Sequence, residues 1–213
     1  MGLYQVTMAI TVGIFMMLAM GLNIITGYTG QVSLGHAAFF GIGAYTSALL
    51  SVKAGVSFWL ALPAAAIVTA AIGAILGAIS TRLHDDSLAI TTIGINFVVV
   101  SVFQYTQFFG GALGVGGIEY PSVLGHALTK PEYLVVVVVC VLLGIWFDRR
   151  LVRSWLGLAL RAVGQNEEAA ESLGIPSARF KIAAFAIGTA YAGVAGSLYA
   201  HFMTFISARD FGF

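Results

Sequence analysis

Long apolar runs separated by short polar interruptions dominate the chain. A helix that crosses the hydrocarbon core of a bilayer, roughly 30 Å thick, needs about 20 predominantly apolar residues. Four runs meet that length, at residues 4–25, 57–79, 87–109 and 182–205. Two shorter runs occupy residues 37–52 and 133–147. The pattern predicts an all-α integral membrane protein, a polytopic helical bundle of about five or six membrane segments.

A high density of glycine interrupts this pattern early in the chain. Between Gly21 and Tyr45, glycines stand at positions 27, 30, 35, 41 and 43. Glycine disfavours an uninterrupted helix, and a backbone polar group that a break frees cannot be left facing lipid. We therefore predict that residues 27–35 leave the helix and face the interior of the bundle, as one broken or re-entrant segment. Whether residues 37–52 cross the membrane completely stays open.

Polar side chains within the apolar runs are candidates for a substrate path. These candidates are Gln31, Ser33, His36, Asn96 and Gln104. Near a broken helix such groups can hold a zwitterion, but they also form ordinary hydrogen bonds between helices. For His36 alone, a satisfied buried histidine is the more common situation, and for Asn96 and Gln104 the two interpretations weigh equally. The spacing also predicts that Gln104 and Gln107 lie on adjacent turns of one helical face.

The basic residues predict the orientation of the bundle, because short loops rich in Lys and Arg stay on the cytoplasmic side. Residues 148–181 contain six of the ten Lys and Arg residues, so this loop is predicted to be cytoplasmic. Counting back along the spans makes residues 110–131 external and the turn at Arg82 internal. The N-terminus is then external if residues 37–52 cross the membrane.

The centre of the cytoplasmic loop has the sequence signals of a short exposed helix. Asn166 can cap its start, Glu167 and Glu168 suit the positive end of the helix dipole, and Gly174 followed by Pro176 ends it. We expect one small apolar face, formed by Ala169, Ala170 and Leu173. A solvated connector is the simpler alternative, but an ordinary connector needs no docking face.

Composition and charge exclude several classes of protein. Hydrophobic residues make up 59% of the chain and charged residues 9%, against about 25% charged in a typical soluble domain. The net charge of +1 and the dispersed basic residues argue against nucleic-acid binding. The single cysteine, Cys140, excludes a disulfide within the chain. The first apolar run lacks the charged leader of a secretory signal, so we expect it to remain in the mature protein.

Sequence patterns for catalysis or metal binding are not found. HExxH, CxxC, GxSxG and P-loop motifs are missing, and Asp85 and Asp86 stand beside Arg82 in a predicted turn. A group of glycines stands at positions 110, 111, 114, 116 and 117. No predicted strand precedes them, as a phosphate-binding loop would require, so we predict a flexible external loop instead. We expect no catalytic residue, metal or cofactor, and any ATP must be hydrolysed by a partner.

Two segments resemble one transporter family. Glu168, Ala169 and Ala170, followed after three residues by Gly174, match the EAA motif with which permeases of ABC importers dock onto their ATPase. The continuation Gly174-Ile175-Pro176 resembles the variant found in branched-chain amino acid permeases, instead of the more common Ile-x-Leu-Pro ending. The glycine-rich stretch from Gly21 to Tyr45 is similar to the early signature of the same family. The resemblance covers nearly all of residues 4–213.

This resemblance implies a permease subunit of an importer for branched-chain amino acids in the bacterial cytoplasmic (inner) membrane. Its partners would be a second homologous permease, two cytoplasmic ABC ATPases, an external substrate-binding protein and membrane lipid. The ATPase-coupling residues would be Glu168, Ala169, Ala170, Leu173 and Gly174. Family members usually carry another helix before this start and several after this end, so residues 1–213 are expected to form a single, partial permease domain.

Other substrates and other classes of protein are also compatible with the sequence. Related permeases transport urea or short amides, and the sequence does not separate these from amino acids. A passive channel is the alternative from a different class, although a channel needs no helix for docking an ATPase. A membrane-embedded enzyme would need catalytic residues, which the sequence does not show.

Overall fold

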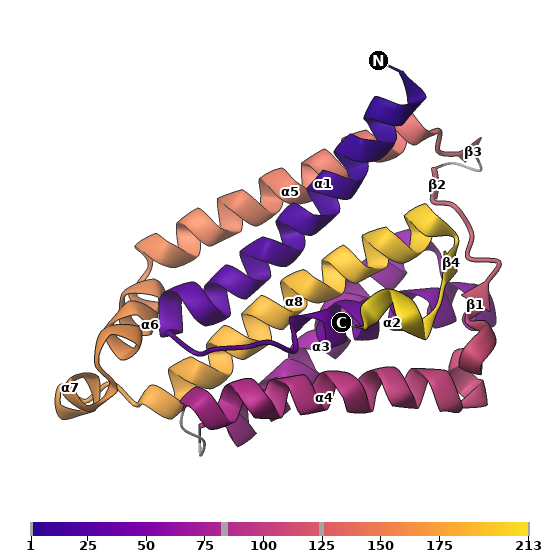
Figure 1. Ribbon diagram of the computed structural model, residues 1–213. Helices are drawn as coiled ribbons and strands as arrows, with labels where there is room; N and C mark the ends of the chain where they lie inside the picture. Colours follow the sequence, from indigo (N-terminus) through magenta and orange to yellow (C-terminus); the bar gives the residue numbers. More distant parts are fainter. Residues whose placement is uncertain (1, 82–84, 124–125, 213) are drawn as a thin grey trace.

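The computed structural model describes residues 2–81, 85–123 and 126–212, without the side chains of Asp85, Asp86 and Val123 (Figure 1). The expected turn at Arg82, with the two aspartate side chains, therefore falls outside the described residues. The helices in chain order are α1 (Leu3–Leu22), the π-helix η1 (Asn23–Tyr28), α2 (His36–Ala54), α3 (Phe58–Ser80), α4 (Asp85–Tyr105), α5 (Lys130–Arg153), α6 (Trp155–Gln165), α7 (Glu167–Ser172) and α8 (Ser177–Met203).

The long helices form an all-α membrane bundle, as predicted. Within the described residues, five segments are long and apolar enough to cross a membrane: Leu3–Tyr28, His36–Ala54, Phe58–Ser80, Ser87–Tyr105 and Ser177–Met203. The second of these is α2, a continuous helix of 19 residues, which agrees with a crossing instead of a segment that turns back. The 24-residue α5 lies beside α1 (Figure 1).

Local signals explain where several helices begin and end. At the start of α5, Glu132 accepts a hydrogen bond from the backbone N–H of Thr129 at 2.6 Å, which satisfies an amide that precedes the first turn. Pro131 occupies the first turn, where its missing N–H costs nothing. At the C-terminal end of a different helix, α2, Gly55 takes a φ of 62° and ends the helix.

Small residues allow helix α8 to lie at the centre of the bundle, against α1, α2 and α3 (Figure 1). A Cβ added at Gly43 would lie 2.5 Å from the Cα atom of Gly193, so α2 and α8 touch backbone to backbone. A Cβ at Gly73 would lie 2.0 Å from the hydroxyl oxygen of Thr189, which brings α3 equally close. Such small-residue contacts are typical of helix packing in membranes, where lipid provides no hydrophobic drive for association.

The ends of the helices form two separate groups. The segments around residues 54–58, 106–123, 126–129 and 204–206 gather at one end of the bundle, and residues 148–176 lie at the opposite end (Figure 1). At the first end the indole N–H of Trp59 donates to the backbone oxygen of Ser122 at 3.0 Å. The two predicted loops, 110–131 and 148–181, thus lie at opposite ends, as the proposed orientation requires.

The predicted flexible loop has local structure. Within the described residues it contains the helical turns Gln107–Phe109 and Gly111–Leu113, and strands β1 (Val115–Gly116), β2 (Ser122–Val123) and β3 (His126–Ala127). Strand β1 pairs antiparallel with β4 (Phe205–Ile206), which follows α8 and precedes the helical turn Ala208–Phe211. The expectation of a flexible loop was therefore incomplete, because pairing across more than eighty residues has no local signal.

The structure also corrects one helix boundary. Helix α4 ends at Tyr105, because Thr106 adopts an extended conformation with φ −95° and ψ 120°. Gln107 therefore lies in a separate helical turn and does not share a helical face with Gln104, as the spacing had predicted.

Candidate functional site

The predicted break in the first helix lies between α1 and α2. The helix continues through η1, and Gly30 then takes a φ of 71°, a conformation that favours glycine. Residues 30–35 are not helical, and α2 begins at His36. The prediction that the glycine-rich stretch leaves the helix is confirmed for residues 30–35, whereas residues 27–29 are still helical.

The side chains of the break alternate between the inside and the outside of the bundle. Gln31 and Ser33 are 1% and 5% exposed, whereas Val32 and Leu34 are 37% and 47% exposed. This segment therefore turns its polar side chains inward and its apolar ones outward. The predicted inward orientation is therefore confirmed for Gln31 and Ser33 but not for Val32 and Leu34.

Hydrogen bonds attach the break to helices α3 and α4. The side-chain oxygen of Gln31 accepts from the hydroxyl of Thr29 at 3.1 Å, and its amide nitrogen donates to the hydroxyl of Ser80 in α3 at 3.2 Å. The backbone N–H of Leu34 donates to the hydroxyl of Thr92 in α4 at 3.0 Å. Of the predicted path residues, Gln31 is therefore a satisfied structural group.

Other polar groups near the break are buried without a partner. The hydroxyl of Ser33, both ring nitrogens of His36 and both side-chain atoms of Asn96 have no hydrogen bond within the part of the chain that the structure describes. Each of these residues is at most 5% exposed. A buried polar group without a partner costs about 1–3 kcal/mol, so these groups could hydrogen-bond a polar ligand.

Gln104 lies apart from these residues. It is half-buried and lies about 12 Å beyond Asn96 along α4, one residue before the helix ends. The structure therefore does not bring Gln104 to the break.

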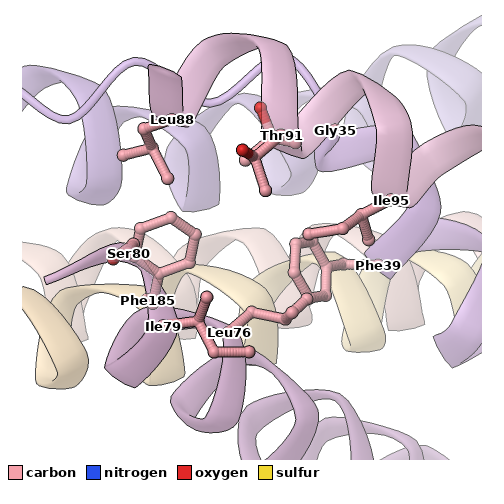
Figure 2. Close-up of a pocket in the computed structure, with 10 residues that line it drawn as sticks. Gly35, Phe39, Leu76, Ile79, Ser80, Leu88, Thr91, Ile95 and Phe185 are labelled. Atoms are coloured by element: carbon pink, nitrogen blue, oxygen red, sulfur yellow. The ribbon is translucent and has the colours of Figure 1, made fainter. Parts of the chain in front are cut away.

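A small apolar cavity lies beside the break, where side chains of α4 face those of α3 and α8 (Figure 2). Its lining comprises Gly35, Phe39, Leu76, Ile79, Ser80, Leu88, Thr91, Thr92, Ile95 and Phe185. Its volume of about 10 Å³ is at the limit for one water molecule. An amino acid does not fit, so the bundle is closed next to the break in this conformation.

Helix α6 in the loop contacts the break directly, which the sequence did not predict. A Cβ added at Gly164 would lie 2.4 Å from the backbone oxygen of Tyr28, and one at Gly30 would lie 3.4 Å from the backbone oxygen of Gly164. The hydroxyl of Tyr28 contacts both carboxylate oxygens of Asp148 at 3.0 and 3.1 Å, and the guanidinium of Arg161 lies 5.4 Å from the Tyr28 ring centre. We call the contact between Gly164 and the backbone of residues 28–30 the glycine joint.

The predicted loop helix is confirmed as α7, with the expected caps. The side-chain oxygen of Asn166 accepts from the backbone N–H of Ala169 at 2.9 Å. At the other end Gly174 has a φ of 81°, and the N–H of Ile175 donates to the backbone oxygen of Ala170 at 3.0 Å. The last carbonyl groups of α7 are thereby satisfied in the manner of a glycine-ended helix.

The exposed face of α7 differs from the expected one at a single residue. Glu168, Ala169 and Gly174 are exposed, and Leu173 is 82% exposed, but Ala170 is only 3% exposed. Ala169 and Leu173 are four residues apart and share a face, whereas Ala170 is rotated by about 100° and packs inward. The prediction that Ala170 shares the outer apolar face was therefore wrong.

Polar contacts fasten α7 to the first turn of α8. The ammonium of Lys181, itself 8% exposed, lies 2.5 Å from a carboxylate oxygen of Glu167, and the hydroxyl of Ser177 donates to Glu171. Burial raises the pKa of Glu167, but the hydrogen bond and the charge of Lys181 outweigh it, so the net pKa lies below its ordinary value. The ion pair is therefore present throughout the neutral pH range.

A chain of buried hydrogen bonds occupies the opposite end of α8. The hydroxyl of Ser47 lies 2.7 Å from that of Ser197 and 3.0 Å from Nε2 of His201. Nδ1 of His201 lies 2.8 Å from the backbone oxygen of Glu119, so Nδ1 carries the donated proton. All three side chains are fully buried, and they attach the loop that contains Glu119 to α2 and α8.

Comparisons with known proteins agree with the membrane bundle. The sequence model of the family described as "Branched-chain amino acid transport system / permease component" matches residues 4–213. The high-affinity branched-chain amino acid transport system permease protein LivM of Salmonella typhimurium is 35% identical over 226 aligned residues, which cover 94% of this chain and 53% of LivM. LivM of Escherichia coli K12 is 34% identical over the same shares of the two chains.

A more distant relative is the probable branched-chain amino acid transport permease protein LivM of Methanocaldococcus jannaschii. It is 31% identical over 158 residues, which cover 71% of this chain and 44% of the relative. No solved structure matches the chain significantly. The chain spans about half the length of the curated relatives it matches.

Proposed function

Because the chain belongs to the permease family of branched-chain amino acid transport systems, we propose that it forms the transmembrane subunit of an ATP-driven importer for leucine, isoleucine and valine. Family and fold make it a multi-pass protein of the cytoplasmic membrane. The observation that carries the proposal is α7, a capped helix that exposes Leu173 and is fastened to the central helix α8 through Lys181. An exposed leucine on a helix anchored in this way suits docking of another protein.

The importer would contain several further subunits. ABC permeases of this family imply an ATPase and a substrate-binding protein. We propose two cytoplasmic ATPases that dock on α7, a second homologous permease beside this one, and an external binding protein that delivers the amino acid. ATP hydrolysis would then occur in the ATPases, and this chain would act by changing conformation, without catalytic residues of its own.

Movement of α7 would reach the break by two routes. The first follows the Glu167–Lys181 pair into α8, which packs against α1, α2 and α3. The second follows α6 to the glycine joint, which contacts the backbone immediately before the break. A displacement that ATP binding imposes on α7 would therefore act on the segment that closes the bundle, as expected for alternating access.

The chemistry of the break supports an amino-acid substrate. The unpartnered groups of Ser33, His36 and Asn96 can donate to a carboxylate and accept from an ammonium group. The adjacent cavity is lined largely by aliphatic and aromatic side chains, including Phe39 and Phe185, which suit an aliphatic side chain once the cavity widens. The relatives named for branched-chain amino acids favour this substrate over urea or an amide.

The test compares two matched substitutions in the full-length protein assembled with its partners. Gly174→Asp introduces a side chain and a negative charge at the C-terminal end of α7, where φ is 81°. Gly117→Asp makes the same change at a glycine with φ 76°, but in the external loop. Neither position has an atom within 4 Å of an added Cβ.

We expect Gly174→Asp to insert in the membrane but to lose co-purification of the ATPase and uptake of leucine. Gly117→Asp should retain the ATPase. A third variant, Leu173→Asp, changes the outer face of α7 without affecting the glycine. Normal ATPase co-purification and uptake in both Gly174→Asp and Leu173→Asp would refute the assignment of α7.

A further inference from the structure

Three arginines surround a hollow at the loop end of α5. The hollow has a volume of about 560 Å³ and is lined by Trp146, Arg149, Arg150, Arg153 and Ser154. All three arginines are exposed, and the guanidinium of Arg150 lies 5.8 Å from the ring centre of Trp146. None of the residues that line the hollow belongs to the break or to α7.

The positive charge of this hollow has no acidic partner. Within the described residues the ion pair found is Lys181–Glu167, which lies elsewhere. The carboxylate adjacent in sequence, Asp148, instead contacts the hydroxyl of Tyr28. Ser154 caps the start of α6, but Arg150 and Arg153 lie in the last turn of α5, so the opposite ends of two helix dipoles meet here and the positive charge comes from the arginines themselves. Charge and geometry therefore favour an anion with several oxygen atoms.

The apolar surface around the hollow indicates that the anion belongs to a lipid. Trp146 is 60% exposed, and Trp155 and Leu158 of α6 are 71% and 62% exposed. On α5, farther from the loop end, Leu142 and Leu143 are each 59% exposed. Tryptophan is enriched at the level of lipid headgroups, and an apolar face on α5 continues from this level toward the membrane core.

We propose that the arginine hollow binds the headgroup of an anionic phospholipid from the cytoplasmic leaflet. The guanidinium groups of Arg149, Arg150 and Arg153 hold the phosphate, and the acyl chains lie along the outward face of α5. Arginine suits this role because its planar guanidinium binds phosphate oxygens in pairs. The occupied site fixes α5 and the start of α6 at a defined depth in the leaflet, next to the loop that carries α7.

The experiment uses the full-length protein reconstituted in vesicles of phosphatidylcholine with a minor fraction of phosphatidylglycerol. Bromine on the acyl chains of one lipid or the other quenches tryptophan fluorescence on contact. A Trp59→Phe background removes the indole at the opposite end of the bundle. We expect brominated phosphatidylglycerol to quench more strongly than brominated phosphatidylcholine at the same mole fraction.

Each arginine removed should lower the affinity for the anionic lipid roughly fivefold. Replacing Arg149, Arg150 and Arg153 together by Gln should therefore abolish the preference for phosphatidylglycerol. The matched control replaces three other exposed basic residues by Gln: Lys130, Arg179 and Arg209. Its preference for phosphatidylglycerol should remain. Because the arginines also orient the chain, a second variant changes them to Lys, which keeps the charge but weakens the preference by removing paired hydrogen bonds.

Each of the following results would overturn the proposal. The first is equal quenching by the two lipids in the unsubstituted arginine hollow, or an unchanged preference in both the Gln and the Lys variants. The second is loss of the preference on addition of inorganic phosphate alone, which would indicate a site for free anions. The third is loss of the preference when the ATPase binds, which would assign this surface to the protein partner.

Discussion

The glycine joint between α6 and the break permits a quantitative test with Gly164→Ala. An added Cβ would lie 2.4 Å from the backbone oxygen of Tyr28 and 3.1 Å from the Cα atom of Thr29. Ordinary contacts between carbon and oxygen begin at about 3.3 Å, so α6 and the end of η1 must separate by roughly 0.9 Å. Overpacking of this kind costs about 1–3 kcal/mol. The substitution therefore opposes the closed joint specifically.

The free energy of unfolding of the whole protein should change by less than the overpacking cost at the glycine joint. Alanine is favoured over glycine in a helix by about 1 kcal/mol, which offsets part of the overpacking. If the joint is tight in only one of the transport conformations, a remaining penalty of about 1.4 kcal/mol changes the ratio of the two conformations about tenfold. We therefore expect uptake of leucine to fall by about an order of magnitude while the thermal unfolding temperature changes by only a few degrees.

The assay is uptake into vesicles that contain the full-length protein with its partners, together with ATPase co-purification. Co-purification should persist, because the exposed face of α7 is unchanged. Gly94→Ala is the matched control, since it makes the same substitution in α4 where no atom lies within 4 Å of the added Cβ. Uptake at the normal rate by Gly164→Ala, or an equal loss in Gly94→Ala, would show that the joint does not transmit movement.

Two further predictions concern orientation and the break. In a Cys140→Ala background, an impermeant maleimide added to intact cells should label Ser122→Cys and not Ser172→Cys, and the reverse result would overturn the assignment of the two ends. Asn96→Leu removes buried polar atoms that have no protein partner, so it should stabilise the protein by about 1–3 kcal/mol in thermal unfolding while raising the KM for leucine. Higher stability with an unchanged KM would mean that Asn96 does not contact the substrate.

Features with local signals could be predicted from the sequence. The long spans follow from the length of their apolar runs, the break from the glycines that include Gly30, and α7 from Asn166 and Gly174. Each depends on chemistry within a few residues of the feature. The face of α7 was predicted less well, because Ala170 satisfies the pattern of a small apolar residue whether it points outward or packs inward.

Features that depend on distant contacts could not be predicted in this way. Gly164 carries no local sign that it will meet Tyr28 and Gly30, and the loop strand β1 pairs with β4 only because α8 returns to the same end. Helix α6 was missed although its buried residues Gly157, Leu160 and Val163 recur at helical spacing, because the loop was interpreted mainly from its charged residues. Among the candidate residues, Gln31 is satisfied and Gln104 lies apart, which the composition of their runs did not reveal.

The hydrogen bonds at the two ends of α8 have a thermodynamic consequence. Lys181 holds α7 at one end of this helix, and His201 holds the loop of Glu119 at the other. If a protein that docks on that loop changes the affinity of α7 for its ATPase, linkage requires that the ATPase change the affinity of the docked protein by the same factor. A tenfold factor corresponds to about 1.4 kcal/mol, which is comparable to the net contribution of one hydrogen bond. A bond from the His201 imidazole to the Glu119 carbonyl that is made in only one of two conformations would supply a coupling of that size.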